Sequence, residues 1–463
     1  MNLDYCHPMR DYFEQDWERV RDCTKGQTHV KQRRVCYLPK TSGMIARSND
    51  KYKDVSTGLT PGELQYRAYL ERARFPDLVL QAESGIMGLA YETEPENDTP
   101  FGDEPVTINK QDTISLSRDA LREVLRTGSA ILLVDAPAAS EANIEPYIIQ
   151  YPIEALKDWA VDDRDKSKLM AIKLEEIYFD DADQFKETEL KRYRIYTLED
   201  GVVTVQLVNE ESRDLIDPVV LSGRDAIPCV FVGSVDTLPT LDPIPLLPIA
   251  HSAVRIYQIS ADHGQFVHGH GQGTHWATGV SEDEQAEIMA TGLGVGSMLF
   301  SAAEEAKFGI LQMAAGSDEV FLNAIKREER TASANAVALV SDGGGVEAAE
   351  SVRIKAAAQH ATIFTILWSV SNGVTKALEM LRDWSGKSGD VVFNIQTDFT
   401  DIHAAEQLIN SLDKAILSGN APRSALFHVL RAAKLTEKTD DEIEAEILDG
   451  GAITDNDSEN EDD

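Results

Sequence analysis

The segment from Ser317 to Trp384 constrains the fold most, because it predicts a helix, a glycine-rich loop and a second, longer helix. Ser317 is a suitable N-cap for the first helix. The glycines of Ser341–Gly345 end that helix, since a run of glycine loses too much backbone entropy to stay helical. Beyond them, apolar residues recur three and four positions apart over roughly thirty residues without proline, which predicts a helix on the order of 50 Å long. Such an arrangement is typical of a mechanical part more than of a catalytic centre.

The chain has 463 residues and a formal net charge of −35 at pH 7. Its length allows about three domains and a large core. A protein that grips nucleic acid through phosphates needs clustered Lys and Arg, so this charge argues against such binding. The charge is compatible with a protein past which nucleic acid slides, because repulsion prevents sticking. The polar N-terminus predicts no signal peptide, and no run approaches the roughly 18 apolar residues of a membrane span.

Residues 37–243 carry the signals of an α+β region. Thr60 and Glu63 form a capping box around Pro61, which predicts a helix start. Helices are expected at Glu63–Phe75, Leu78–Ala90 and Arg118–Arg126, the last with Ser117 as its N-cap. Strands are expected at Ala130–Val134, Tyr147–Tyr151, Ala171–Tyr178, Arg192–Thr197, Val202–Val208 and Cys229–Val232. The turn Glu199–Gly201 predicts a hairpin between two of these strands. Gly85 and Gly88 are expected to allow another segment to pack closely against their helix. Residues 1–35 show no clear hydrophobic period, which predicts an N-terminal arm.

A cluster of prolines between 239 and 248 marks a boundary, after which helical periodicity resumes at Leu246. Residues 269–316 are rich in glycine, acids and short strand signals, and they separate this helix from the one that begins near Ser317. Further elements are expected as a strand at Val391–Ile395, helices at His403–Leu417, Arg423–Ala433 and Asp440–Leu448, and a disordered acidic tail at Ile453–Asp463.

Four histidines, His263, His268, His270 and His275, form the one constellation that points to metal chemistry. Their H-x4-H-x-H-x4-H spacing differs from the H-E-x-x-H motif, which places two ligands on one helix face, and Asp262 is the only adjacent acid. Polar histidines at a helix end and in a glycine-rich turn explain the pattern more simply. A metal-dependent hydrolase built on this group is retained as the alternative function.

Other candidate sites are weaker. The glycines of Gly292–Ser297 are not followed by lysine, so they do not form a phosphate-binding loop. The segment Asp413–Lys434 has the length of a helix-turn-helix, yet it carries few basic residues and acids flank it, which favours a plain helical hairpin. The four cysteines lack C-x-x-C spacing and are expected as free thiols. No cofactor and no enzyme activity are predicted.

The order of these elements resembles the portal proteins of tailed bacteriophages, especially a portal-like family of otherwise uncharacterised phage proteins. The residues that carry the resemblance are Tyr37-Leu38-Pro39 with Gly43-Met44, Tyr66–Tyr69 with Arg72–Phe75, Leu125-x-Thr127-Gly128 before Ala130–Val134, Arg330–Ala334, and Phe393-Asn394 with Thr397–Phe399. It covers about residues 37–440. Each motif is loose and none is catalytic, so the match depends on their order.

The resemblance implies a portal-type α+β subunit. Its parts would be an N-terminal arm (1–36), an α/β wing (37–243), a stem helix (246–268), a small α/β clip (269–316), a second stem helix (317–339), a tunnel loop (341–347), a long wing helix with a wing strand (351–403), a helical crown (404–448) and an acidic tail (449–463). The subunits would form a ring of about twelve at one vertex of the capsid.

The resemblance also implies function and partners. Double-stranded DNA would pass through the ring without sequence specificity during packaging, retention and ejection. The ring would bind terminase, a head-tail adaptor, the major capsid protein and scaffolding protein. No membrane would be involved. The ring would be assembled in the host bacterial cytoplasm and would reside in the virion. The tunnel loop would comprise Ser341, Asp342, Gly343, Gly344, Gly345, Val346 and Glu347, and the stem would line the channel with Lys326, Arg327, Glu328, Arg330, Ser333 and Asn335.

Asp342 and Glu347 would place charge of the same sign as DNA at the constriction, which fits a repelling lining better than a gripping valve. A third possibility is a phage head component that assembles without conducting DNA.

Overall fold

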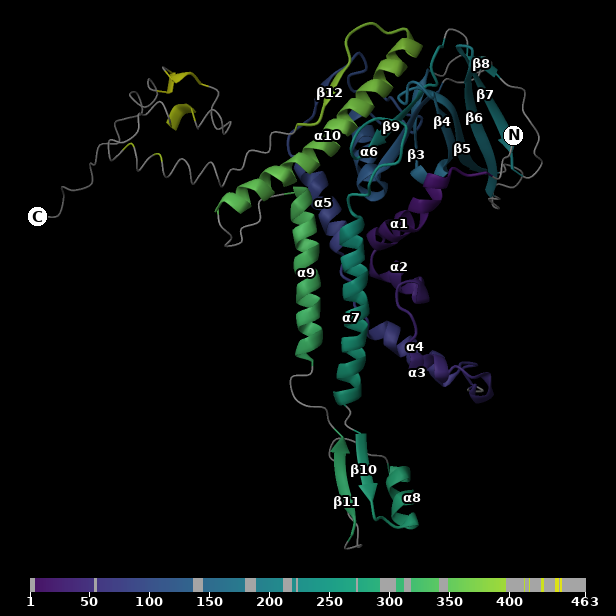
Figure 1. The fold of residues 1–463 in the computed structure, drawn as a ribbon, viewed down its shortest axis with the longest axis vertical. Helices are drawn as coiled ribbons and strands as arrows, with labels where there is room; N and C mark the ends of the chain where they lie inside the picture. The colour runs from purple at the N-terminus through teal and green to yellow at the C-terminus, as the bar shows by residue number, and fades with distance from the viewer. Residues whose placement is uncertain are drawn as a thin grey trace, which may run out of the picture. The chain divides into compact units, whose positions relative to one another are not determined.

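A computed structural model describes residues 5–53, 56–135, 145–179, 189–210, 219–221, 224–271, 274–291, 305–311, 318–340 and 349–396, together with positions 412, 416, 426–428, 438–440 and 442–443. The chain forms two compact units, Met1–Ile395 and Gln396–Asp463. The first combines helices and sheets, which confirms the mixed α+β class (Figure 1). The predicted helices at 403–417, 423–433 and 440–448 and the acidic tail lie mostly or wholly outside the described residues.

The N-terminal segment is a packed helical layer, so the prediction of an arm is wrong. It forms α1 (Pro8–Thr24), α2 (Gln27–Gln32) and α3 (Ser42–Ala46), with single turns at Arg34–Cys36 and Asp50–Tyr52. On α1, Trp17, Val20 and Cys23 are buried, and the indole of Trp17 donates a hydrogen bond to the carbonyl of Thr127, 2.9 Å away. The sequence of α1 does not show a clear helical spacing of apolar residues, because the charged Asp22 also lies on its buried side. There Asp22 accepts a hydrogen bond from Tyr37.

Two helices that the sequence predicted follow this layer. Helix α4 (Pro61–Arg72) begins with the expected capping box, in which Thr60 and Glu63 bond each other's backbone amides. Helix α5 spans Leu78–Ala90, as predicted. The expected start of the next helix is wrong: α6 spans Thr113–Thr127 with Asp112 as its N-cap. Ser117 instead lies inside α6, is buried, and donates to the carbonyl of Ile114.

Two antiparallel sheets form the β part of the first unit. One has the strand order β3-β2-β9, from Tyr147–Tyr151, Ser129–Asp135 and Cys229–Gly233. The other has the order β4-β5-β6-β7-β8, from Leu156–Val161, Leu169–Phe179, Glu189–Glu199, Val202–Asn209 and Val219–Leu221. The predicted hairpin joins β6 to β7, where Asp200 and Gly201 both have positive φ (48° and 78°). All six strands predicted within residues 37–243 are therefore present, and β4 and β8 are additional strands that the sequence did not predict.

The remaining elements alternate between long helices and short strands. They are β1 (Glu96–Asp98), α7 (Leu247–Gly271), β10 (Thr274–Thr278), α8 (Glu282–Thr291), β11 (Lys307–Leu311), α9 (Glu319–Val340), α10 (Ala349–Ser385) and β12 (Val392–Asn394). Strands β10 and β11 pair with each other, and β1 pairs with β12. The single turn Ile153–Ala155 precedes β4.

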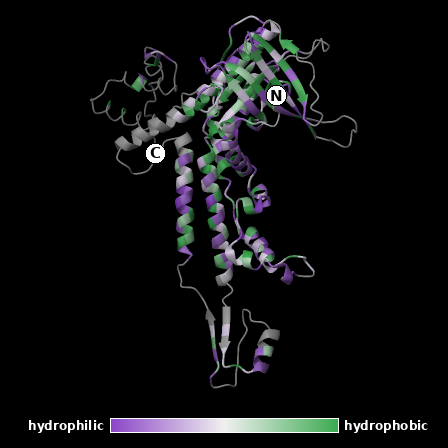
Figure 2. Ribbon diagram, turned by 45° about the vertical axis from the view of Figure 1, so that its right-hand side comes forward, coloured by the Kyte–Doolittle hydropathy of each residue, from purple (hydrophilic) through white to green (hydrophobic). Residues whose placement is uncertain are grey.

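The core lies where α6 and α10 pack on each other and on the three-stranded sheet. Strand β2 is buried from Ser129 to Val134, and α10 buries Ile363, Leu367, Val370, Val374 and Leu378. Figure 2 shows apolar residues concentrated in the strands, whereas polar and apolar residues alternate along α7 and α9. Among the described residues, no helix combines the length and hydrophobicity that a bilayer span requires.

Candidate functional site

Helices α7 and α9 lie side by side as an antiparallel pair (Figure 1). Phe321, near the start of α9, packs against the rings of His263 and Phe266 near the end of α7, with centroid distances of 5.9 and 5.3 Å. Strands β10 and β11 and helix α8 are inserted between the two helices in the sequence. Both helices were predicted from periodicity, and both are confirmed.

Helix α4 supports α7 through polar contacts. The hydroxyl of Tyr69 donates to Asp262 at 2.6 Å, and Arg72 donates to Gln265 at 2.9 Å. Burial, reinforced by the neighbouring Asp262, raises the pKa of the Tyr69 hydroxyl. Gly264 faces the side chain of Arg72 so closely that an added Cβ would lie 3.1 Å from it. These contacts fix α7 to the layer that precedes the sheets.

The six predicted stem residues on α9 divide between two faces. Lys326, Arg330 and Ser333 are exposed and fall within about 60° of one another on a helical wheel. Glu328 and Asn335 are half-buried and lie on the side of Ala332, which is 2 % exposed. Arg327 is exposed between these faces, 3.9 Å from Glu328. Four of the six predicted residues are therefore exposed: Lys326, Arg330 and Ser333 on one face, and Arg327 beside it.

The helices α7 and α9 contribute nothing to the net negative charge of the chain. Helix α9 contains three basic and three acidic residues, and α7 contains one of each. Their formal charge is zero, whereas the whole chain has −35. The acidity that we expect to keep nucleic acid from sticking is therefore carried by other parts of the chain than these two helices.

The predicted loop Ser341–Glu347 lies outside the described residues. Helix α9 ends at Val340 and α10 begins at Ala349, so the two predicted helices flank this segment as expected. Helix α10 has 37 residues, which corresponds to about 55 Å.

The histidine group is only partly described. His263 contacts Phe321, and His268 is exposed near the end of α7. His270 is at the end of the same helix and His275 is on β10, but their side chains are outside the described part. Within the described residues, no three His, Cys, Asp or Glu side chains converge as metal ligands.

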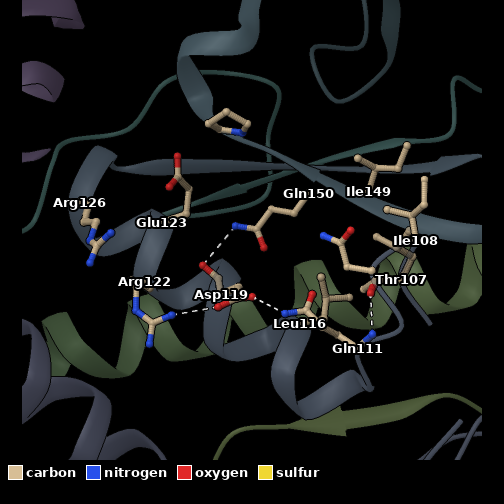
Figure 3. A pocket seen from close by; sticks show the side chains of 13 residues that line it. Thr107, Ile108, Gln111, Leu116, Asp119, Arg122, Glu123, Arg126, Ile149 and Gln150 are labelled. Atoms are coloured by element: carbon tan, nitrogen blue, oxygen red, sulfur yellow. Dashed lines mark hydrogen bonds and ion pairs between the residues drawn. The ribbon is translucent and has the colours of Figure 1, made fainter. Parts of the chain in front are cut away.

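A polar cavity of about 320 Å³ lies between α6 and β3 (Figure 3). Asp119 accepts hydrogen bonds from Arg122 at 2.9 Å and from Gln111 at 2.8 Å, and its backbone carbonyl accepts one from Gln150 at 3.1 Å. Glu123 at its edge is paired with Arg21 at 2.6 Å, and burial raises the pKa of this carboxyl. Because these charged groups have partners within the fold, the cavity shows no cationic group ready for an anionic ligand.

A larger cavity of about 590 Å³ lies where the five-stranded sheet meets β3. Glu176 there accepts hydrogen bonds from Tyr151 and Arg194 at 2.5 Å and from Arg192 at 2.6 Å. Burial alone would raise the pKa of Glu176, but Arg194 and these hydrogen bonds hold it below its usual value. The cluster joins two sheets, which is a structural role. No sequence motif contains these residues, because they come from separate strands.

A third cavity, of about 350 Å³, lies beside α10 and is mainly apolar. It is lined by Ser234, Val235, Pro243, Pro245, Thr362, Thr365 and Ile366. Its wall is held by several hydrogen bonds within the loop that follows β9. Sequence patterns did not indicate this cavity, because the loop reaches α10 only in the folded chain.

The fold defines a mixed α+β protein with a helix hairpin, a small insertion and a long following helix. The model of one family, described as a domain of unknown function (DUF4055), matches residues 245–385. The match begins just before α7 and ends with α10, so it contains the helix pair, the insertion and the long helix. No curated protein matches the chain significantly.

Proposed function

We propose that this chain is the subunit of a phage portal ring, located at the unique vertex of the capsid, through which double-stranded DNA is packaged, retained and ejected. The observation that carries the proposal is the antiparallel pair α7 and α9, which flanks a small inserted module and is followed directly by the long helix α10. This order corresponds to stem, clip, stem and wing helix in the resemblance. The family match over residues 245–385 coincides with this part of the chain.

In this proposal the parts have mechanical roles. The wing comprises the two sheets with α4, α5 and α6, and the N-terminal helices α1 to α3 belong to it instead of forming an arm. The clip, with β10, β11 and α8, binds terminase during packaging and the head-tail adaptor afterwards. Residues 341–347 form the tunnel loop between α9 and α10, and residues 404–448 form the crown. The ring is assembled in the host cytoplasm and resides in the virion, where it contacts capsid and scaffolding proteins.

The exposed face of α9 supports a passage for DNA. Lys326 and Arg330 are exposed on one face, and Glu329 is exposed beside them. A duplex carries one negative charge per about 1.7 Å of its axis, so a strongly basic wall would hold it and a strongly acidic wall would exclude it. The exposed charges of α9 are of both signs, so this face neither holds a duplex as a wholly basic wall would nor excludes it as a wholly acidic wall would, which allows movement without sequence preference.

Imaging of the purified full chain by negative-stain microscopy tests the proposal. We expect rings with a central hole, because the exposed faces of α7 and α9 need neighbouring copies to enclose a bore. Monomers at every protein and salt concentration would refute a portal. Metal analysis of the same sample tests the histidine alternative, and only a stoichiometric transition metal would favour the hydrolase.

A further inference from the structure

Helix α10 exposes two aromatic side chains one turn apart. Phe364 is 48 % exposed and Trp368 is 51 % exposed, although Ile363, Ile366 and Leu367 beside them are buried. Large aromatic residues stabilise protein interfaces strongly, and each buries about 150–250 Å² when fully covered. The pair therefore forms an apolar projection, which we call the aromatic knob.

The cavity beside α10 lies on the other flank of the same helical turns. Thr362, Thr365 and Ile366 line it. On a helical wheel their mean direction is about 130–140° away from that of Phe364 and Trp368. The buried stripe of α10 lies in the wider arc that separates the two directions, so the knob and the cavity are on different sides of the helix at the same level.

The remaining wall of the cavity is rigid. Ser234 donates to the carbonyl of Pro243 at 2.8 Å, and Asp242 accepts from the amide of Val235 at 2.8 Å. The amine of Lys376 on α10 donates to Thr237 at 2.6 Å, which ties this loop to the helix. The cavity of about 350 Å³ is mainly apolar and already formed, so few protein groups need to become ordered when an aromatic side chain enters it.

Charge indicates which partner fits. Residues 356–375 contain no Asp, Glu, Lys or Arg, although these types make up 27 % of the chain. None of the residues that line the cavity is charged either. Two copies with a net charge of −35 each repel one another, so they approach most easily through an uncharged surface. A partner of another kind, drawn to such an acidic chain, would be basic and would find no carboxylate here.

We infer that the aromatic knob of one copy inserts into the α10 cavity of the next copy. Knob and cavity are different surfaces, so the contact is head-to-tail, and it closes into a ring if the rotation between copies permits. The inference rests on the proposed function for the ring geometry, while the contact itself rests on the surfaces of α10. It assigns Phe364 and Trp368 to the interface between subunits.

Cysteine cross-linking of the full chain tests this contact. In a Cys36→Ser background, which removes the one exposed cysteine of the described residues, the double variant Val235→Cys, Asn372→Cys is treated with a short bismaleimide. Asn372 is half-buried and follows Trp368 by one helical turn, so this variant keeps both aromatic side chains. We expect a ladder of multimers on a denaturing gel. Each single variant gives no conjugate, and a mixture of the two gives dimers only. Replacing Val235→Cys by Val392→Cys, at a side chain 40 % exposed on β12, is the matched control and gives no ladder.

The outcomes separate this inference from the proposed function. Rings in the microscope without the ladder overturn the inference and leave the portal proposal intact. A ladder without rings supports the head-to-tail contact and counts against the portal. Dimers from Asn372→Cys alone indicate a symmetric pairing of the two α10 helices and overturn the inference. A second measurement adds Phe364→Ser and Trp368→Ser to the double-cysteine chain. The ladder should be lost while the far-ultraviolet circular dichroism stays as in the parent, and an unchanged ladder would contradict the assignment.

Discussion

Glu176 on β5 accepts hydrogen bonds from Tyr151 on β3 and from Arg192 and Arg194 on β6. Arg194 also donates to Asp135 at the end of β2, 2.8 Å away. The five-stranded sheet is thereby joined to the three-stranded sheet by a charged cluster. Single residues in such a cluster matter because removal of one partner leaves another charge buried without compensation.

We predict that Glu176→Gln lowers the free energy of unfolding by about 3 kcal/mol at pH 7. The folded pKa of this acid is depressed, so its stabilisation is present above the unfolded value near 4.5 and is lost as the pH falls through the folded value. Urea unfolding at pH 7 and at pH 3 measures the difference, which should shrink at the lower pH. Asp163→Asn, at an exposed carboxylate, is the control and should leave the midpoint unchanged. An equal loss at both pH values would contradict the role of the ionised carboxylate.

At the scale of elements, the packing of α10 on β9 depends on one glycine. A Cβ at Gly373 would lie 2.5 Å from Cγ2 of Val232. Two residues earlier on α10, Ser371 donates to the carbonyl of Leu367 and accepts from the amide of Ile395. The end of β12 is thereby fixed to the same helix. Glycine at this position is a packing requirement of the tertiary structure.

We predict that Gly373→Ala lowers the free energy of unfolding by about 1–3 kcal/mol, because overpacking outweighs the better helix propensity of alanine. The matched variant is Gly88→Ala in α5, where an added Cβ meets no described atom within 4 Å. That substitution should stabilise the protein by up to about 1 kcal/mol. Thermal or urea unfolding of both variants measures the difference. If Gly373→Ala instead stabilised the protein, the close contact between α10 and β9 would not require a glycine at this position.

At the scale of the whole molecule, the acidity is unevenly distributed. Residues 396–463 contain seventeen acidic and five basic residues, whereas α7 and α9 are neutral. About a third of the net charge therefore belongs to the second unit. In an assembly of many copies, these charges repel one another at distances that depend on salt.

We predict that assembly of the full chain strengthens as the salt concentration rises from about 0.02 to 0.5 M, because the Debye length falls from roughly 20 Å to about 4 Å. Apolar contacts such as the aromatic knob are not weakened by that change. Analytical ultracentrifugation at several salt concentrations measures the assembled fraction. If the assembled fraction instead fell as the salt concentration rose, the copies would be held together by ion pairs and not by apolar side chains.

Much of the element order followed from the sequence, because long periodic helices and alternating strands carry their own signals. The helices α5, α7, α9 and α10 and six strands of the two sheets were predicted within a few residues, whereas β4 and β8 were not predicted. The capping box at Thr60 and the hairpin at Gly201 were also predicted, since each depends on residues adjacent in the chain.

The errors share one physical cause. Helix α1 was missed because its buried Asp22 is compensated by Tyr37, a partner outside the helix. Gly85 and Gly88 were expected at close contacts, yet a Cβ at either would meet no described atom within 4 Å, whereas one at Gly373 would clash with Val232. The cavities, the exposed Phe364 and Trp368 and the division of the α9 residues into two faces depend on distant segments that meet in space. The sequence alone determined which segments form helices and strands, because those signals are local. Only the tertiary structure decided which faces are covered and which stay open to a partner, because burial depends on residues far away in the chain.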